Sequence, residues 1–152
     1  MKKILKLKAF LILTLLITGA SCQKEYEKEY NWAYPLSGEW TVNVKYGEEI
    51  YGPIFIKTYN SSFGQDSIWI DDNGNFWPFK AKAKVDINGL NFETSNFTSY
   101  SGGKYEDLVT IRNAKVIKTD SIYFEIEFGS DPGTLYHFSG HRRVSYDEYM
   151  SH

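Results

Sequence analysis

Apolar and polar residues alternate along most of the chain after residue 36, as they do in half-buried β-strands. In the stretch 37–45, Trp40, Val42 and Val44 fall on one face, and the residues between them are polar. No segment after residue 21 keeps the 3.6-residue period of an amphipathic helix. The pattern therefore predicts an all-β domain.

Turn-forming residues divide this pattern into about eight strands at hairpin spacing. Asn-Gly pairs at 73–74 and 88–89 are candidates for type I′ turns, because both residue types readily adopt positive φ. The polar, glycine-containing stretch 96–104 is predicted to be a loop, and Pro53 to stand at the start of a strand. We expect a single antiparallel up-and-down barrel. Its strands are predicted at 37–45, 54–59, 67–71, 75–87, 90–94, 108–118, 121–128 and 135–143.

The strand predicted at 75–87 decides which side chains face the interior of the barrel. Its three lysines alternate with Ala81, Ala83, Val85 and Ile87. A one-residue slip would bury the lysines, so we expect the apolar set to point inward. Two alanines leave room for a small ligand in a barrel of this size. Alternatively, bulky rings from across the barrel fill that room. The sequence leaves both alternatives open. The candidates for filling the room are Trp40, Trp69 and Trp77.

The first 21 residues have the three parts of an export signal. Residues 1–8 are basic, 9–17 are apolar and 18–21 are small. The apolar run is well short of the ~20 residues that a membrane-spanning helix needs. The small stretch followed by Cys22 resembles a bacterial lipobox, with Gly19 where Leu is usual. The resemblance implies cleavage before Cys22 and diacylation of its thiol, and the alternative is a soluble secreted protein.

The division of the chain follows from this leader, which we assign to residues 1–21. Residues 22–33 are charged and lack apolar periodicity, so we expect a polar tether, followed by the barrel domain at 34–152. A lysine and acidic residues just after Cys22 resemble the surface-export signal of lipoproteins in one group of Gram-negative bacteria. We therefore expect an outer-membrane lipoprotein that faces either the cell surface or the periplasm.

Charge and cysteine content narrow the range of partners. The chain has 17 basic and 19 acidic residues, and four of its lysines lie in the leader. Without the leader the formal net charge is about −6, which argues against binding to a nucleic-acid backbone. The single cysteine, Cys22, excludes both an intrachain disulfide and a cysteine-based metal site.

Five short blocks of sequence, taken in order along the chain, are informative together. They are Leu-Ser-Gly-Glu-Trp at 36–40, Lys-Thr-Tyr-Asn at 57–60, Ile-Trp-Ile-Asp-Asp at 68–72, Phe-Lys-Ala-Lys at 79–82 and Phe-Ser-Gly-His-Arg-Arg at 138–143. Together they resemble the bacterial lipid-binding putative hydrolase family, a set of lipocalin-like lipoproteins, over residues 34–149. The resemblance implies a lipocalin-like barrel, lipid binding and hydrolysis, although no motif of that family fixes a catalytic residue.

Lipocalin-like barrels often stack an arginine from a late strand on the tryptophan of the opening strand. If Tyr136 and Phe138 face inward, Arg142 does also, and the resemblance then implies that it stacks on Trp40 and closes one barrel end. Arg143 is the competing candidate if the register differs by one residue. The residues that we expect to contact a ligand are Trp40, Trp69, Trp77, Phe79, Ala81, Ala83, Phe124, Tyr136 and Arg142.

Catalytic and metal-binding motifs do not stand out. The chain has neither a Gly-x-Ser-x-Gly elbow nor a His-Glu-x-x-His motif. His137 and His141 would lie on one strand face about 13 Å apart at ~3.3 Å per residue, too far to share a zinc ion, and we expect that face to be outside. Asp71 and Asp72 could bind calcium, but the spacing of an EF-hand loop is absent. We therefore assign no catalytic residue, no metal and no cofactor.

Two further triplets, Asp-Ser-Ile at 66–68 and 120–122, resemble an O-glycosylation site of some Gram-negative bacteria, with Ser67 and Ser121 as acceptors. Asp-Ser is also ordinary turn chemistry, so both explanations stay open.

The favoured interpretation is a lipid-anchored extracytoplasmic binding protein that holds a lipid or another small apolar or amphipathic ligand inside its barrel. One alternative is an accessory or structural lipoprotein of an outer-membrane uptake system, which would bind a glycan or a membrane protein on its outer face. The other alternative is a hydrolase. The sequence leaves the identity of the ligand and the oligomeric state open.

If Cys22 is the acylated N-terminus, Cys22→Ser removes the anchor. We expect the variant to move from the membrane fraction to the soluble fraction when cells are fractionated, because two or three acyl chains are what hold such a protein stably on a bilayer. A variant that stays in the membrane fraction at unchanged yield would show that Cys22 is not the anchor.

Overall fold

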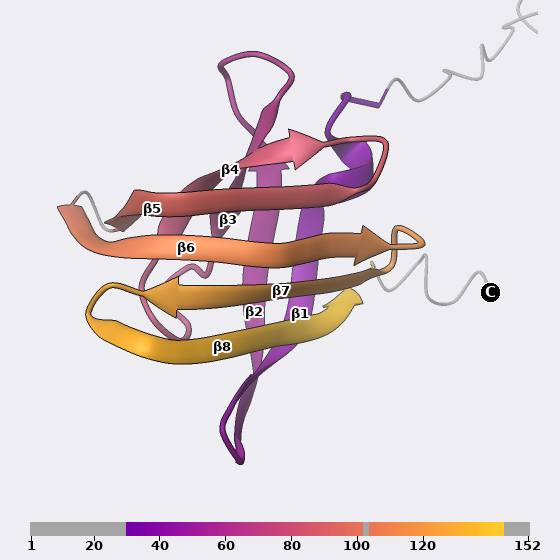
Figure 1. Ribbon diagram of the computed structural model, residues 1–152. Coiled ribbons are helices and arrows are strands. Elements are labelled where there is room, and N and C mark those ends of the chain that lie inside the picture. Colours follow the sequence, from indigo (N-terminus) through magenta and orange to yellow (C-terminus); the bar gives the residue numbers. More distant parts are fainter. Residues whose placement is uncertain (1–29, 102–103, 145–152) are drawn as a thin grey trace, which may run out of the picture.

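The computed structural model describes residues 30–101 and 104–144. The predicted leader, Cys22, most of the predicted tether and the tail after residue 144 lie outside these residues. Within them, eight antiparallel strands form one closed barrel in sequential order, and β8 pairs with β1 (Figure 1). The predicted all-β barrel is therefore confirmed. A short 3₁₀ helix, η1 (Tyr34–Leu36), precedes the strands β1 (Gly38–Tyr46), β2 (Glu49–Asn60), β3 (Ser67–Asp71), β4 (Lys80–Asp86), β5 (Asn91–Ser101), β6 (Lys104–Ile117), β7 (Ser121–Phe128) and β8 (Asp131–Arg142).

The alternation of apolar and polar residues decides which side chains enter the barrel. On β4, Ala81 and Ala83 point inward and are fully buried, as predicted. Ile87 is 37% exposed, so its predicted inward position is wrong, because β4 ends at Asp86 and the alternation ends with it. The same rule holds on β7, where the inward-facing side chains are Ile122, Phe124, Ile126 and Phe128.

Bulges explain where strand boundaries differ from the prediction. β2 begins five residues early and contains Pro53, because a register shift opposite Asn43 accommodates a residue that cannot donate a backbone hydrogen bond. The stretch 96–104, predicted to be a loop, contains the end of β5 and the start of β6. Three register shifts let these polar strands stay paired as they bend, and Ser99 is fully buried between them.

Aspartates redirect two other segments. Asp86 accepts a hydrogen bond from the backbone N–H of Asn88 (3.1 Å), and the positive φ of that turn falls on Leu90 (52°). The predicted type I′ turn at 88–89 is therefore wrong. Residues 75–79, predicted to be part of β4, form a loop because Asp72 binds their backbone N–H groups. By contrast, the Asn-Gly pair at 73–74 has positive φ at both residues, as predicted (57° and 76°).

Arg142 and Trp40 close the seam between β1 and β8. The two residues are register partners, and the guanidinium carbon lies 4.5 Å from the centroid of the Trp40 ring. The guanidinium also donates to the carbonyl oxygens of Ser37, Thr119 (2.7 Å) and Pro35 (3.3 Å). The predicted stack is thus confirmed for Arg142. Arg143 instead lies over Phe55 on the outer face.

The Trp40 ring is fixed on its other side as well. Its indole N–H donates to the hydroxyl of Thr58 (2.8 Å), and that buried hydroxyl donates to the carbonyl oxygen of Leu36 (2.6 Å). A chain of hydrogen bonds therefore joins η1, β1 and β2 beneath the seam, and every polar atom in it has a partner.

Two glycines allow the close approach at this seam. A Cβ atom at Gly38 would lie 2.8 Å from Nη1 of Arg142, so the glycine two residues before Trp40 makes room for the guanidinium. A Cβ atom at Gly140 would overlap the backbone of Thr41 and Val42. The first and last strands can therefore pair at Gly140 only because that position lacks a side chain, and Gly38 leaves the Arg142 guanidinium its place.

We expect Arg142→Met to lower the free energy of unfolding by ~1–3 kcal/mol, because it removes the stack on Trp40 and the charge-assisted hydrogen bonds to three carbonyl oxygens, two of them partly buried. Arg143→Met is the matched control, and its exposed pairing with Glu39 predicts a loss of less than ~1 kcal/mol. Guanidinium unfolding of both variants gives the comparison. Equal losses in the two would contradict the role assigned to Arg142.

Candidate functional site

A loop that crosses one end of the barrel is organised by a single buried carboxylate, that of Asp72. Oδ1 accepts hydrogen bonds from the backbone N–H groups of Gly74 (2.9 Å) and Phe79 (3.1 Å), and Oδ2 accepts one from Phe76 (3.1 Å). Burial raises the pKa of Asp72, the three N–H groups oppose that rise, and the charge of Asp71 adds to it. The loop therefore depends on one carboxylate whose charged form is disfavoured by burial.

Three aromatic side chains of this loop, Phe76, Trp77 and Phe79, form what we call the aromatic plug. The Trp77 ring stacks on Phe128 with the ring centroids 4.8 Å apart and the planes 12° apart. Phe76 lies edge-on to Tyr136 (5.5 Å between centroids), and Phe79 lies edge-on to Phe128 (5.8 Å). Phe79 is fully buried, and the other two rings are half-buried. The plug thus covers the barrel end with apolar surface.

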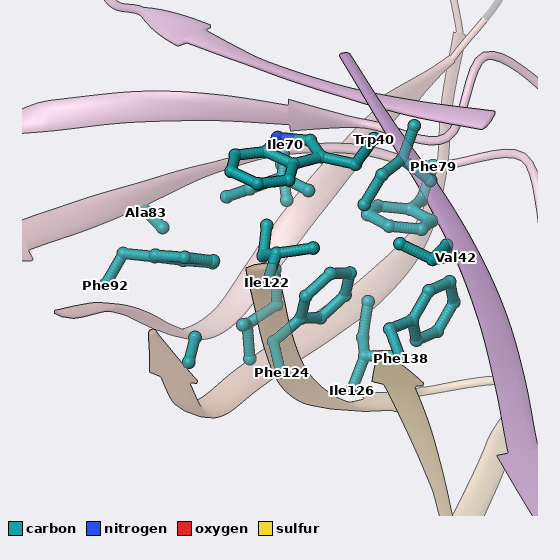
Figure 2. Close-up of a cluster of buried hydrophobic side chains, with 14 of the residues drawn as sticks. Trp40, Val42, Ile70, Phe79, Ala83, Phe92, Ile122, Phe124, Ile126 and Phe138 are labelled. Atoms are coloured by element: carbon teal, nitrogen blue, oxygen red, sulfur yellow. The ribbon is translucent and has the colours of Figure 1, made fainter. Parts of the chain in front are cut away.

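Between the plug and the Trp40 end, the interior is occupied by large side chains (Figure 2). The rings of Phe124 and Phe138 are stacked with centroids 4.6 Å apart, and Phe92 lies 6.1 Å from Phe124. Ala81 and Ala83 are fully buried within this core. Of the three tryptophans that were candidates for filling the room beside the alanines, Trp40 is fully buried in the core.

The structure brings most of the predicted ligand-contacting residues into this interior. Those that point inward and are buried are Trp40, Phe79, Ala81, Ala83, Phe124 and Tyr136. Trp77 belongs to the plug, and Arg142 lies at the opposite end of the barrel. The placement of Trp69 in the interior is wrong: Ile68 and Ile70 take the inward positions of β3, so Trp69 lies on the outer face, edge-on to Phe97 at 6.1 Å.

Sequence reasoning missed Asp72 and Phe76 as organisers of this end. The signal that pointed to them was an aspartate directly before Asn-Gly, a residue type whose side chain often binds backbone N–H groups two to four residues further on. Asp71 and Asp72 are also residue types that bind calcium, although the spacing of an EF-hand loop is absent. In the structure Asp71 accepts the N–H of Asn73 (2.8 Å), so both carboxylates serve the turn itself.

A polar cluster lies on the outer face of β7 and β8. The hydroxyl of Tyr123 donates to Glu125 (2.8 Å) and lies 3.0 Å from Nδ1 of His137. The bond from Tyr123 lowers the pKa of Glu125, and burial raises the pKa of Tyr123 to about 12. His137 is on the outside, as predicted.

Two absences hold for the part of the chain that the structure describes. Its histidine, aspartate and glutamate side chains form no group of three or more that could hold a metal ion. Residues 30–101 and 104–144 also contain no helix with the length and apolar character needed to cross a membrane.

A closed antiparallel barrel of this size either is filled by its own side chains or holds one small ligand. Residues 25–147 match the family described as lipid-binding putative hydrolase. The match covers most of the chain, and the chain belongs to this family, as the five sequence blocks predicted. No curated protein is significantly similar to it. The family and the barrel together fit a lipid-binding role.

We expect Asp72→Asn to lower the free energy of unfolding by ~1–3 kcal/mol, because the amide nitrogen cannot accept the N–H of Phe76. The folded-state pKa of Asp72 lies above the unfolded value of 3.8, so the wild type binds an extra proton on folding between these two values. The free energy of unfolding of the wild type should therefore exceed that of the variant by a growing amount as the pH falls from the folded-state pKa of Asp72 to 3.8.

Urea unfolding at several pH values measures both effects. Asp71→Asn is the matched control, since the neighbouring carboxylate is less buried and binds one turn N–H group. If Asp71→Asn destabilises the barrel as much as Asp72→Asn, the loop is not organised by Asp72.

Proposed function

We propose that the protein binds a lipid or another amphipathic ligand inside the barrel, and that the ligand enters at the end covered by the aromatic plug. The observation that carries the proposal is the plug itself: three rings that continue the apolar core but belong to a loop rather than to a strand. Membership of a lipid-binding family supports it.

The two ends of the barrel differ in how they are held. At the Trp40 end, the guanidinium of Arg142 joins η1, β1, β8 and the turn between β6 and β7. At the plug end, the loop is held by the hydrogen bonds that Asp72 accepts, by neutral hydrogen bonds between Asn75 and β2, and by contacts between rings. Charge-assisted bonds to several segments are harder to open than ring contacts of one loop, so the plug end is where we place the opening.

An acyl chain can replace the plug without loss of apolar contact. Each CH₂ group that leaves water contributes ~0.8 kcal/mol, so a chain of ordinary length offsets the exposure of two or three rings. The rings that would receive it, Phe128, Tyr136 and Phe138, are already in contact with the plug. The ligand's polar end would remain at the barrel mouth, beside the hydroxyl of Tyr136 and the carboxylate of Asp131 (2.6 Å apart).

The location of the protein is part of the same proposal. The leader and Cys22 support an outer-membrane lipoprotein, in which a short polar segment holds the barrel close to the bilayer. A barrel tethered in this way has lipid within reach at high local concentration.

Quenching by a brominated fatty acid tests the proposal, because bromine quenches tryptophan fluorescence only at close range. We expect dibrominated stearic acid to quench the wild-type protein in a saturable manner. Trp77→Phe should remove a large share of that quenching, since Trp77 lies in the plug. Trp69→Phe is the matched control on the outer face and should leave the quenched share unchanged.

Two results would count against an interior lipid site. One is quenching that disappears in Trp69→Phe, which would place the lipid on the outer face. The other is the lack of saturable quenching by dibrominated stearic acid and by a dibrominated phospholipid.

A further inference from the structure

A groove of about 690 Å³ lies across the outer faces of β4, β5, β6 and β7, near the end of the barrel away from the plug. It forms where β6 carries an extra residue: the register shifts between Arg112 and Lys115, and Asn113 has a φ of 51°. A bulge of this kind bends a strand and redirects its side chains. The volume lies within the range of small-molecule sites.

The chemistry of the groove differs from that of the interior. Phe92 and Ala114 turn their side chains into the core, so they contribute backbone to its floor. The outward-facing side chains that line it are two lysines, three carboxylates, two amides and one tyrosine, and the aliphatic residue of the lining, Val85, is half-buried and packs against the core. An acyl chain placed here would strip water from several charges, which makes this groove unsuitable for the lipid of the proposed function.

Charges of both signs alternate across the groove. Lys84 on β4 is the register partner of Glu93 on β5, and Lys115 and Glu125 lie on β6 and β7 beyond them. A ligand with a charge of one sign would meet repulsion as well as attraction. A neutral ligand with many hydroxyl groups can donate to the carboxylates and accept from the lysines and amides at the same time. Carbohydrates have this chemistry.

Tyr123 and Glu125 are held in place before any ligand binds. The carboxylate of Glu125 accepts from the Tyr123 hydroxyl and from Nδ2 of Asn113 (2.8 Å each). Each carboxylate oxygen keeps a lone pair for a further donor, and the half-buried ring of Tyr123 offers a flat apolar surface for the C–H face of a sugar. Fixed side chains lose little entropy on binding.

We propose that this groove binds a neutral carbohydrate, either a free saccharide or the glycan of a glycolipid. The groove and the interior lie on opposite faces of the same strands. Both ligands can therefore be bound at once, and the two sites can be tested separately.

NMR titration of the ¹⁵N-labelled full chain with neutral oligosaccharides tests the proposal, using maltohexaose, cellohexaose, laminarihexaose, xylohexaose and mannohexaose. We expect at least one to give saturable shifts confined to the strand segments that line the groove. Its Kd should change less than about twofold between about 0.05 and 0.5 M NaCl, because a neutral ligand is insensitive to screening.

Tyr123→Ala should weaken that binding by about tenfold or more, since it removes the ring and frees Glu125. Tyr59→Ala is the matched control: Tyr59 is also a half-buried tyrosine on the outer face, with its hydroxyl 3.4 Å from the carboxylate of Asp71, but it lies on β2, away from the groove. Glu93→Phe provides a second variant, because it blocks the groove from an exposed position without disturbing the core.

Dodecyl maltoside and maltose separate the two sources of sugar. Tighter binding of the glycoside that is lost in Glu93→Phe assigns the groove to the glycan of a glycolipid whose alkyl chain lies outside the groove, and equal affinities assign it to free saccharides. The proposal is overturned if no oligosaccharide binds, if shifts map elsewhere, if Glu93→Phe binds like the wild type, or if salt weakens binding strongly. Quenching by dibrominated stearic acid should be unchanged in Glu93→Phe, so failure here leaves the interior site standing.

Discussion

The stack of the Arg142 guanidinium on the ring of Trp40 is the interaction on which the closed barrel depends. A barrel has no free edge only if its first and last strands pair, and here these strands come from opposite ends of the described chain. Arg142 ties that seam to carbonyl oxygens of η1, its flanking residue Ser37 and the turn between β6 and β7. Gly38 and Gly140 supply the space that the seam requires.

The closure leaves a barrel with two unlike ends. One is held by a cation that bonds to several segments, and the other by aromatic rings that a single buried carboxylate keeps in position. Large side chains pack between the two ends, so in the proposed function a lipid enters by displacing the plug. The plug suits that role because its side chains can move without breaking a strand pair.

The two-residue period of a strand allows one sheet to present two chemistries. Inward positions of β4–β7 supply the apolar core, whereas outward positions supply charged and amide groups around a bend in β6. The interior suits apolar chains and the outer groove suits hydroxyl groups. A family defined by lipid binding can therefore carry a second, polar site on the same strands with no cost to the core.

The sequence by itself determined the barrel and the facing of Ala81 and Ala83, because strong alternation is a local signal. The Trp40–Arg142 stack followed only from the resemblance to lipocalin-like barrels. The sequence did not place Trp69, since β3 has apolar residues on both faces and alternation then gives no answer. It also missed the loop at 75–79 and the paired strands at 96–104. At 75–79, hydrogen bonds that the Asp72 carboxylate accepts from nearby backbone N–H groups overrode the alternation, and at 96–104 bulges between β5 and β6 did so. Only the folded structure decided the plug and the groove, because both depend on which distant strands become neighbours.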